Sequence, residues 1–140
     1  MQSLDLICNK VIPATPSQVF EMWTDPDKFK CWWGPVGVNC SKVELDFKVG
    51  GSYSIENLFE DGGTLMITGV YEEIVEDKKL VYSWVVGNSD SIEKVTVLFD
   101  QHSDGTMLTV IHKKITSIDI QKKHAVGWRG CLDKLYLYSI

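Results

Sequence analysis

Apolar and polar positions alternate along most of the chain, which is typical of strands with one buried face. The pattern predicts about six or seven strands, separated by short turns rich in Gly, Asp and Ser. Their expected ranges are 3–12, 40–47, 52–59, 64–75, 80–86, 92–100 and 106–113. The connections between the later strands are short, so we expect an antiparallel sheet that is mostly a meander. Gly69, inside one of these strands, indicates a bulge or bend.

Two short helices are predicted between the first strand and the rest. Thr15-Pro16 and Asp25-Pro26 each place a capping residue before a proline, which is a helix-start signal. The Gly34-Pro35 pair ends the second helix and opens a loop over residues 34–39.

The last segment changes to a helical period. Thr116 or Ser117 caps a long helix whose bulky side recurs at steps of three and four. That side consists of Ile120, His124, Gly127, Trp128, Cys131, Leu132, Leu135 and Tyr136. A glycine inside a helix costs about 1 kcal/mol relative to alanine, so Gly127 and Gly130 predict a close approach of the sheet or a ligand.

Only one face of each strand is apolar, so the sheet needs a cover, and the C-terminal helix is long enough to provide it. We therefore predict an α+β fold of order β-α-α-β6-α, in which a curved antiparallel sheet wraps the long C-terminal helix. The length of 140 residues and the absence of a linker or repeat predict one domain over residues 1–140.

Charge and composition exclude several classes of function. The net charge is −5 and the lysines are scattered or paired, so we expect no nucleic-acid partner. No apolar run reaches the roughly 18 residues of a membrane span, and the N-terminal residues show no signal peptide. The cysteines, Cys8, Cys31, Cys40 and Cys131, have neither zinc nor disulfide spacing. We expect free thiols, a cytoplasmic location, and neither a metal nor a cofactor.

Bulky residues from the helix and the apolar face of the sheet should converge, as in a small-molecule cavity with apolar walls. The alternative is that they only fill the core. The candidate ligand-binding residues are Trp32, Trp33, Tyr53, Ile55, Met66, Tyr82, Trp84, Phe99, His112, Trp128 and Leu132.

His112 is the weak candidate for catalysis. It is in phase with Leu108 and Val110, so it should point inward. An inward histidine near Tyr82 would suit proton transfer at neutral pH; the alternative is a core histidine held by a hydrogen bond. Trp32 and Trp33 precede the Gly34-Pro35 loop, so they could form a lid over the cavity mouth or an interaction anchor. The alternative is that one of them fills the end of the core and the other is half exposed.

Eight short motifs, taken in order, resemble a known family. They are Val11–Pro16, Val19-Phe20, Trp32–Pro35, Gly50–Tyr53, Gly69–Ile74, Leu80–Trp84, Gly105–Val110, and Gly127-Trp128 with Leu132 and Leu135. Together they resemble the C-terminal domain of activators of the heat-shock protein 90 ATPase, within the START/birch-pollen-allergen (SRPBCC) superfamily. The resemblance implies the helix-grip fold, in which a curved sheet grips a long C-terminal helix.

Three functions follow from these observations. The first is binding of a small apolar or amphipathic ligand between sheet and helix. The second, implied by the resemblance, is a protein-interaction module with a chaperone partner in the stress response, supported by an exposed Trp32. The third is an enzyme of cyclase or dehydratase type using His112. The sequence leaves the ligand and the oligomeric state open.

Overall fold

The elements of the fold follow the predicted order closely. The structure, a computed structural model, describes residues 4–140, so Ser3 of the predicted first strand lies outside the described residues. The strands are β1 (Leu6–Ile12), β2 (Val38–Leu45), β3 (Ser52–Phe59), β4 (Thr64–Val75), β5 (Lys79–Val86), β6 (Glu93–His102) and β7 (Gly105–Lys113). The helices are α1 (Pro16–Thr24), α2 (Pro26–Trp32) and α3 (Ile118–Ser139).

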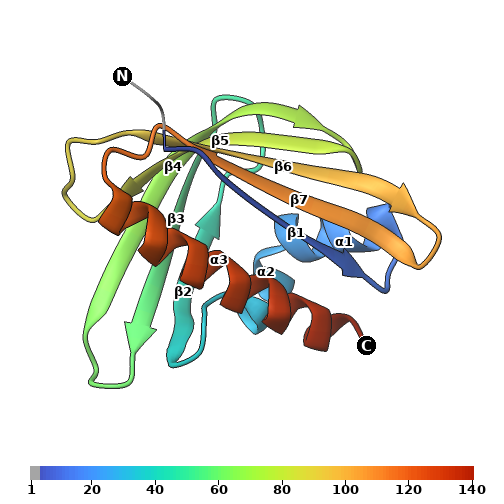
Figure 1. Cartoon of the computed structure of the whole chain (residues 1–140), viewed down its shortest axis with the longest axis horizontal. Helices are drawn as coiled ribbons and strands as arrows, with labels where there is room; N and C mark the ends of the chain where they lie inside the picture. The colour runs from blue at the N-terminus through green and yellow to red at the C-terminus, as the bar shows by residue number, and fades with distance from the viewer. Residues whose placement is uncertain (1–3) are drawn as a thin grey trace.

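The strands form one antiparallel sheet in the order β1-β7-β6-β5-β4-β3-β2. Figure 1 shows this sheet curling around α3, with α1 and α2 near one end of the curl. From β2 onward each strand pairs with the next in sequence, and β1 closes onto β7. The predicted α+β helix-grip architecture is therefore confirmed.

The predicted capping residues start the helices. Thr15 and Gln18 form a reciprocal capping box at α1, and the Asp25 carboxylate accepts a hydrogen bond from the Asp27 amide at α2. Ser117 rather than Thr116 caps α3, because its hydroxyl accepts from the Ile120 amide at 3.1 Å. These caps fix where each helix leaves the sheet, and so position α3 across the concave face.

The core lies between that concave face and the helices, and Trp32 is part of it. Its side chain is 0% exposed, and its indole N–H donates to the Met22 carbonyl at 2.8 Å. The ring packs on Trp23 and Phe29, with ring centroids at 4.8 and 5.0 Å. The prediction of a half-exposed Trp32 is wrong, because α1 and α2 pack together and enclose it.

Around Met66, the inward and outward faces of β4 are the reverse of the prediction. Ile67 is buried, whereas Met66 is 36% exposed and lies on the outer face. The segment Leu65-Met66-Ile67 is apolar at three consecutive positions, so alternation alone could not select the buried face. The irregularity in this strand occurs between Tyr71 and Glu73, while Gly69 lets the ring of Tyr53 and the Ser83 carbonyl approach the backbone.

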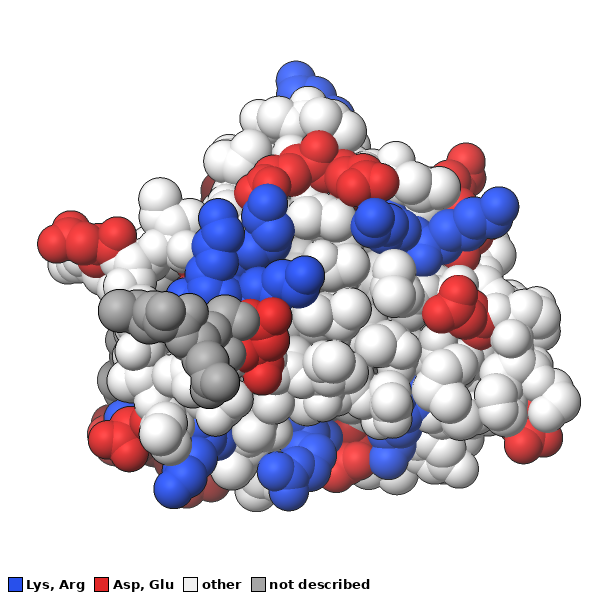
Figure 2. All heavy atoms as spheres, turned by 45° about the horizontal axis from the view of Figure 1, so that its top comes forward, with Lys and Arg blue, Asp and Glu red and all other residues white. Residues whose placement is uncertain are grey.

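The outer surface carries charges of both signs. Figure 2 shows basic groups lying beside acidic ones on the face drawn there, with no continuous basic stripe. The ion pair between Lys94 and Glu72, at 2.8 Å, links β6 to β4 across the intervening β5. All four cysteines are free thiols. Among the described residues, no helix is both long and apolar enough to span a bilayer.

Candidate ligand-binding site

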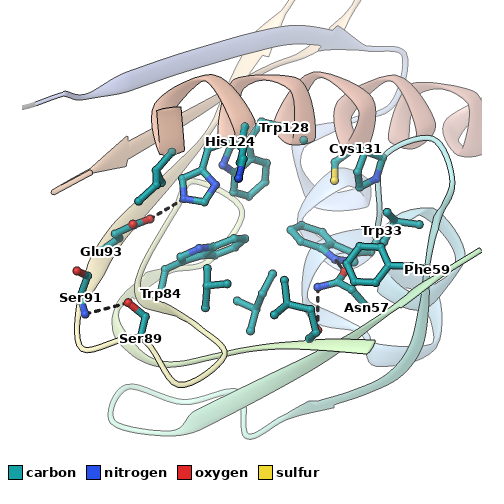
Figure 3. Close-up of a pocket in the computed structure, with 18 residues that line it drawn as sticks. Trp33, Asn57, Phe59, Trp84, Ser89, Ser91, Glu93, His124, Trp128 and Cys131 are labelled. Carbon is teal, nitrogen blue, oxygen red and sulfur yellow. Dashed lines mark hydrogen bonds and ion pairs between the residues drawn. The ribbon is translucent and has the colours of Figure 1, made fainter. Parts of the chain in front are cut away.

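A cavity of about 480 Å³ lies between the concave face of the sheet and α3. Its walls are mostly apolar and aromatic, and include Trp33, Phe59, Ile67, Trp84, Val86 and Trp128. Figure 3 shows Glu93, Ser91 and Ser89 at one end, and Trp33, Asn57 and Phe59 at the other. The cavity therefore has a polar end and an apolar end.

Helix α3 faces the cavity with a narrow stripe of residues. Ile120, His124, Gly127 and Cys131 recur at steps of four, three and four, which places them on one side of the helix. A Cβ added at Gly127 would meet no atom within 4 Å. The predicted close approach of the sheet at Gly127 is wrong; the missing side chain instead leaves open space beside the cavity.

Gly130 behaves as predicted. A Cβ there would come within 2.8 Å of the Cβ of Pro35, in the loop that follows α2. Such a separation is shorter than a van der Waals contact, so only glycine lets this loop lie against α3. The loop therefore seats on the helix next to the cavity, where Pro35 is one of the lining residues.

The apolar end has its few polar groups paired. The indole N–H of Trp33 donates to the Asn57 side-chain oxygen at 2.9 Å, and the Asn57 amide donates to the Leu65 carbonyl at 3.3 Å. Burial raises the pKa of the Cys131 thiol to about 12. Cys131 is therefore a protonated, unreactive wall residue at neutral pH.

The polar end is organised around the carboxylate of Glu93, which is 5% exposed. One of its oxygens, Oε1, lies 2.6 Å from Nε2 of His112 and 2.8 Å from Nε2 of His124. The two imidazoles are stacked, with ring centroids 4.5 Å apart. Figure 3 shows the His124 ring reaching from α3 toward Glu93.

The tautomer of His112 follows from its second neighbour. The indole nitrogen of Trp128 lies 3.0 Å from Nδ1 of His112. An indole N–H only donates, so Nδ1 must accept, and the proton of a neutral His112 sits on Nε2, where it is donated to Glu93. Burial lowers the pKa of His112, which keeps the ring neutral.

Glu93 stays ionised despite its burial. Burial alone would raise its pKa, but the hydrogen bonds from His112 and His124 outweigh that effect and bring the pKa to about 2. A carboxylate that accepts two hydrogen bonds is stabilised in its charged form. The polar end of the cavity therefore carries a buried negative charge.

Glu93, His112 and His124 have ligand atoms within 4.8 Å of one another, as in a metal site. A metal on Nε2 of His112 would move the imidazole proton to Nδ1, where it would face the Trp128 N–H. Metal-bound histidines usually donate from their other nitrogen to an acceptor. The Trp128 contact therefore favours the hydrogen-bonded cluster over a metal centre.

Trp84 contributes a polar atom that has no partner. Within residues 4–140, its Nε1 is the one buried side-chain nitrogen or oxygen without a hydrogen bond. Trp84 is directly opposite Glu93 in the β5–β6 pairing, and both residues line the cavity. A buried N–H without an acceptor costs about 1–3 kcal/mol, so its position beside the cavity calls for a functional explanation.

The predicted ligand-binding residues fall into separate places. Trp33, Trp84 and Trp128 line the cavity, and His112 lies behind it in the Glu93 cluster. The others lie outside the lining: Trp32, Phe99 and Leu132 are core residues, Tyr53, Ile55 and Tyr82 surround a small neighbouring gap, and Met66 is on the outer face. The structure thus brings together the tryptophans and His112.

Sequence reasoning missed Glu93 and undervalued His124. Glu93 has the same phase in its strand as Val95, Val97 and Phe99, so a carboxylate on the inner face was visible in the pattern. The helical period places His124 on the apolar side of the helix but does not indicate Glu93 as its hydrogen-bond partner. Only the β6–β7 register and the position of α3 bring these groups to one point.

Comparison with known proteins places the chain among related sequences and folds. The family model described as activator of Hsp90 ATPase homolog 1-like protein matches residues 13–139. No curated protein matches the chain.

Solved structures share the fold over nearly the whole chain. A Chromobacterium violaceum protein is 26% identical, with a TM-score of 0.89 and coverage of 96% of both chains. An AHSA1 protein from Silicibacter pomeroyi is 19% identical, with a TM-score of 0.83 and coverage of 95% of both chains. An AHSA1-like protein from Aeromonas hydrophila is 22% identical, with a TM-score of 0.77 and coverage of 96% of this chain and 90% of its own. The names of these three proteins state no ligand or reaction.

Proposed function

We propose that this chain, which belongs to the family of activator of Hsp90 ATPase homolog 1-like proteins, binds a small apolar or amphipathic ligand between the sheet and α3. The observation that carries the proposal is the cavity of about 480 Å³ with aromatic walls and a few polar groups at one end. Small-molecule sites typically have volumes of about 300–1,000 Å³ and this kind of lining. Protein interiors otherwise pack densely, with few voids larger than a water molecule.

Gly127 supplies a direct test, because a side chain added there would extend into the cavity without a clash. Gly127→Leu should fill part of the cavity, and removing the helical glycine favours the helix. Val126→Leu is the matched control, since Val126 is the adjacent helix residue and is 65% exposed. We expect Nile red, a neutral apolar dye, to bind the wild type and the control, and to lose at least about tenfold in affinity, or 1.4 kcal/mol, in Gly127→Leu.

The measurement is a fluorescence titration with the dye, accompanied by circular dichroism to confirm that each variant is folded. Equal dye affinity in all three proteins would place the dye elsewhere on the surface. Absence of dye binding to the wild type would refute the proposal.

The two alternative functions have weaker support. An exposed Trp32 would favour a chaperone-binding module, but Trp32 is fully buried. Proton transfer by His112 would require a free ring nitrogen, but Nε2 faces Glu93 and Nδ1 faces Trp128. Ligand binding therefore has the strongest support of the three functions.

A further inference from the structure

Two incomplete hydrogen-bonding groups lie side by side at the polar end of the cavity. Trp84 and Glu93 are opposite each other on β5 and β6, and opposed residues on one face of a sheet have Cβ atoms about 4.5–5.5 Å apart. Both residues are 5% exposed. The Trp84 ring also lies 5.2 Å from the His112 ring and 6.0 Å from the His124 ring, between centroids, so the indole packs against the Glu93 cluster.

The two groups have opposite requirements. Trp84 offers a buried N–H that has no acceptor within the described part of the chain. Both histidines bind Oε1 of Glu93, which leaves Oε2 without a donor among the described side chains. Because Glu93 lines the cavity, a ligand there can reach its free oxygen.

A hydroxyl group is the simplest ligand group that satisfies both. Its oxygen accepts one hydrogen bond while its proton donates another. An ammonium group would serve only Glu93, since it has no acceptor. A carboxylate would serve only Trp84, and its charge would face the ionised Glu93 in a site with little screening.

We propose that the ligand of this cavity is an alcohol or phenol, whose hydroxyl donates to Oε2 of Glu93 and accepts from Nε1 of Trp84. This inference rests on the proposed function and names the chemical class of the ligand. The apolar body then lies along the tryptophan walls toward Trp33 and Phe59 (Figure 3).

Other charged and titratable groups at the cavity do not reverse this preference. His124 is held by its Nε2 contact with Glu93. Lys123 also lines the cavity, but its side chain is exposed at the rim. Solvent and salt screen an exposed charge far more than a buried one. The buried carboxylate of Glu93 therefore dominates the selection of the ligand's polar group.

Three probes with the same alkyl chain separate the contributions: decanol, decylamine and decanoate. The two charged probes are used below their critical micelle concentrations, and decanol is used below its solubility limit. The affinity of each probe is measured by its displacement of Nile red at neutral pH. The titration is done with the wild type, Trp84→Phe and Glu93→Gln. Trp84→Phe keeps an aromatic ring and removes the N–H. Glu93→Gln keeps an oxygen that accepts from both histidines and removes the charge, so the cluster can persist.

We expect decanol to bind the wild type at least about tenfold more tightly than decanoate. Trp84→Phe should weaken decanol by about five- to tenfold and leave decylamine nearly unchanged, because only the alcohol uses the N–H. Glu93→Gln should weaken decylamine more than decanol. In proton–nitrogen NMR spectra, the Trp84 indole proton should move downfield with decanol and not with decylamine.

Other results would overturn the inference. Equal binding of all three probes would show that the polar end does not select the head group, while cavity binding itself would stand. Equal weakening of every probe by Trp84→Phe would show that the ring acts only through its shape. If Nile red does not bind the wild type at all, the proposed function fails together with this inference.

Discussion

Trp128 fixes which nitrogen of His112 carries the proton, through a single hydrogen bond. Because its N–H donates to Nδ1 of His112, the His112 proton is directed to Glu93, and the carboxylate is retained in its charged form. The chain of contacts then returns to α3 through His124. Two residues of the helix are thus joined to one carboxylate of the sheet, and the cluster helps to fix α3 across the cavity.

The carboxylate of Glu93 should make the free energy of unfolding depend on pH in the acidic range. Its pKa in the folded chain is about 2, lowered from the ordinary value of 4.5, so the stabilisation is present above pH 4.5 and is lost as the pH falls toward 2. The shift corresponds to roughly 3 kcal/mol. We expect the free energy of unfolding of the wild type to exceed that of Glu93→Gln at neutral pH, and the difference to shrink below pH 4.5.

Urea denaturation of both proteins at several pH values measures this difference. His112, whose pKa is lowered from 6.5, contributes a further loss as the pH falls below 6.5, because the unfolded chain then binds the proton first. This loss is already under way before Glu93 is protonated. A difference between the two proteins that stays constant from neutral pH to about pH 2 would contradict the role assigned to Glu93.

Substitution of the two glycines of α3 by alanine should change the stability of the protein in opposite directions. Gly127→Ala adds a methyl group into open space and should stabilise the protein by up to about 1 kcal/mol, through helix propensity. Gly130→Ala drives its Cβ against Pro35 and should destabilise by about 1–3 kcal/mol, as overpacking does. Chemical denaturation of the pair, which share helix and chemistry, gives the comparison. Destabilisation by Gly127→Ala would mean that the helix is closely packed there after all.

The elements were predictable because their signals are local. Thr15-Pro16 and Asp25-Pro26 identify helix starts, and alternation from Ser52 to Phe59 identifies a strand, without reference to the rest of the chain. The site was only partly predictable, because it depends on which side chains meet across elements. Trp33, Trp84 and Trp128 were named from their size and phase, whereas Glu93 required knowledge of the β5–β6 and β6–β7 registers. Leu65-Met66-Ile67 shows the remaining limit, since consecutive apolar residues leave the facing of a strand undefined.

The five tryptophans pack together across the layers of the fold. All five are buried, and they come from α1, α2, the residue that follows α2, β5 and α3. Trp128 lies within 6.2 Å, between ring centroids, of Trp23, Trp33 and Trp84. The aromatic core therefore belongs to no single element, and loss of any layer should expose it.

This arrangement predicts that the chain unfolds as one cooperative unit. Tryptophan fluorescence reports the shared core, and far-ultraviolet circular dichroism reports the sheet and helices. We expect the two probes to give the same midpoint in urea, as in a two-state transition. Fluorescence that changes at lower urea than dichroism would show that α1 and α2 detach while the sheet persists. In that case the segment that follows α2, which contributes Trp33 and Pro35 to the cavity lining, would be the part of the lining expected to loosen with the two helices.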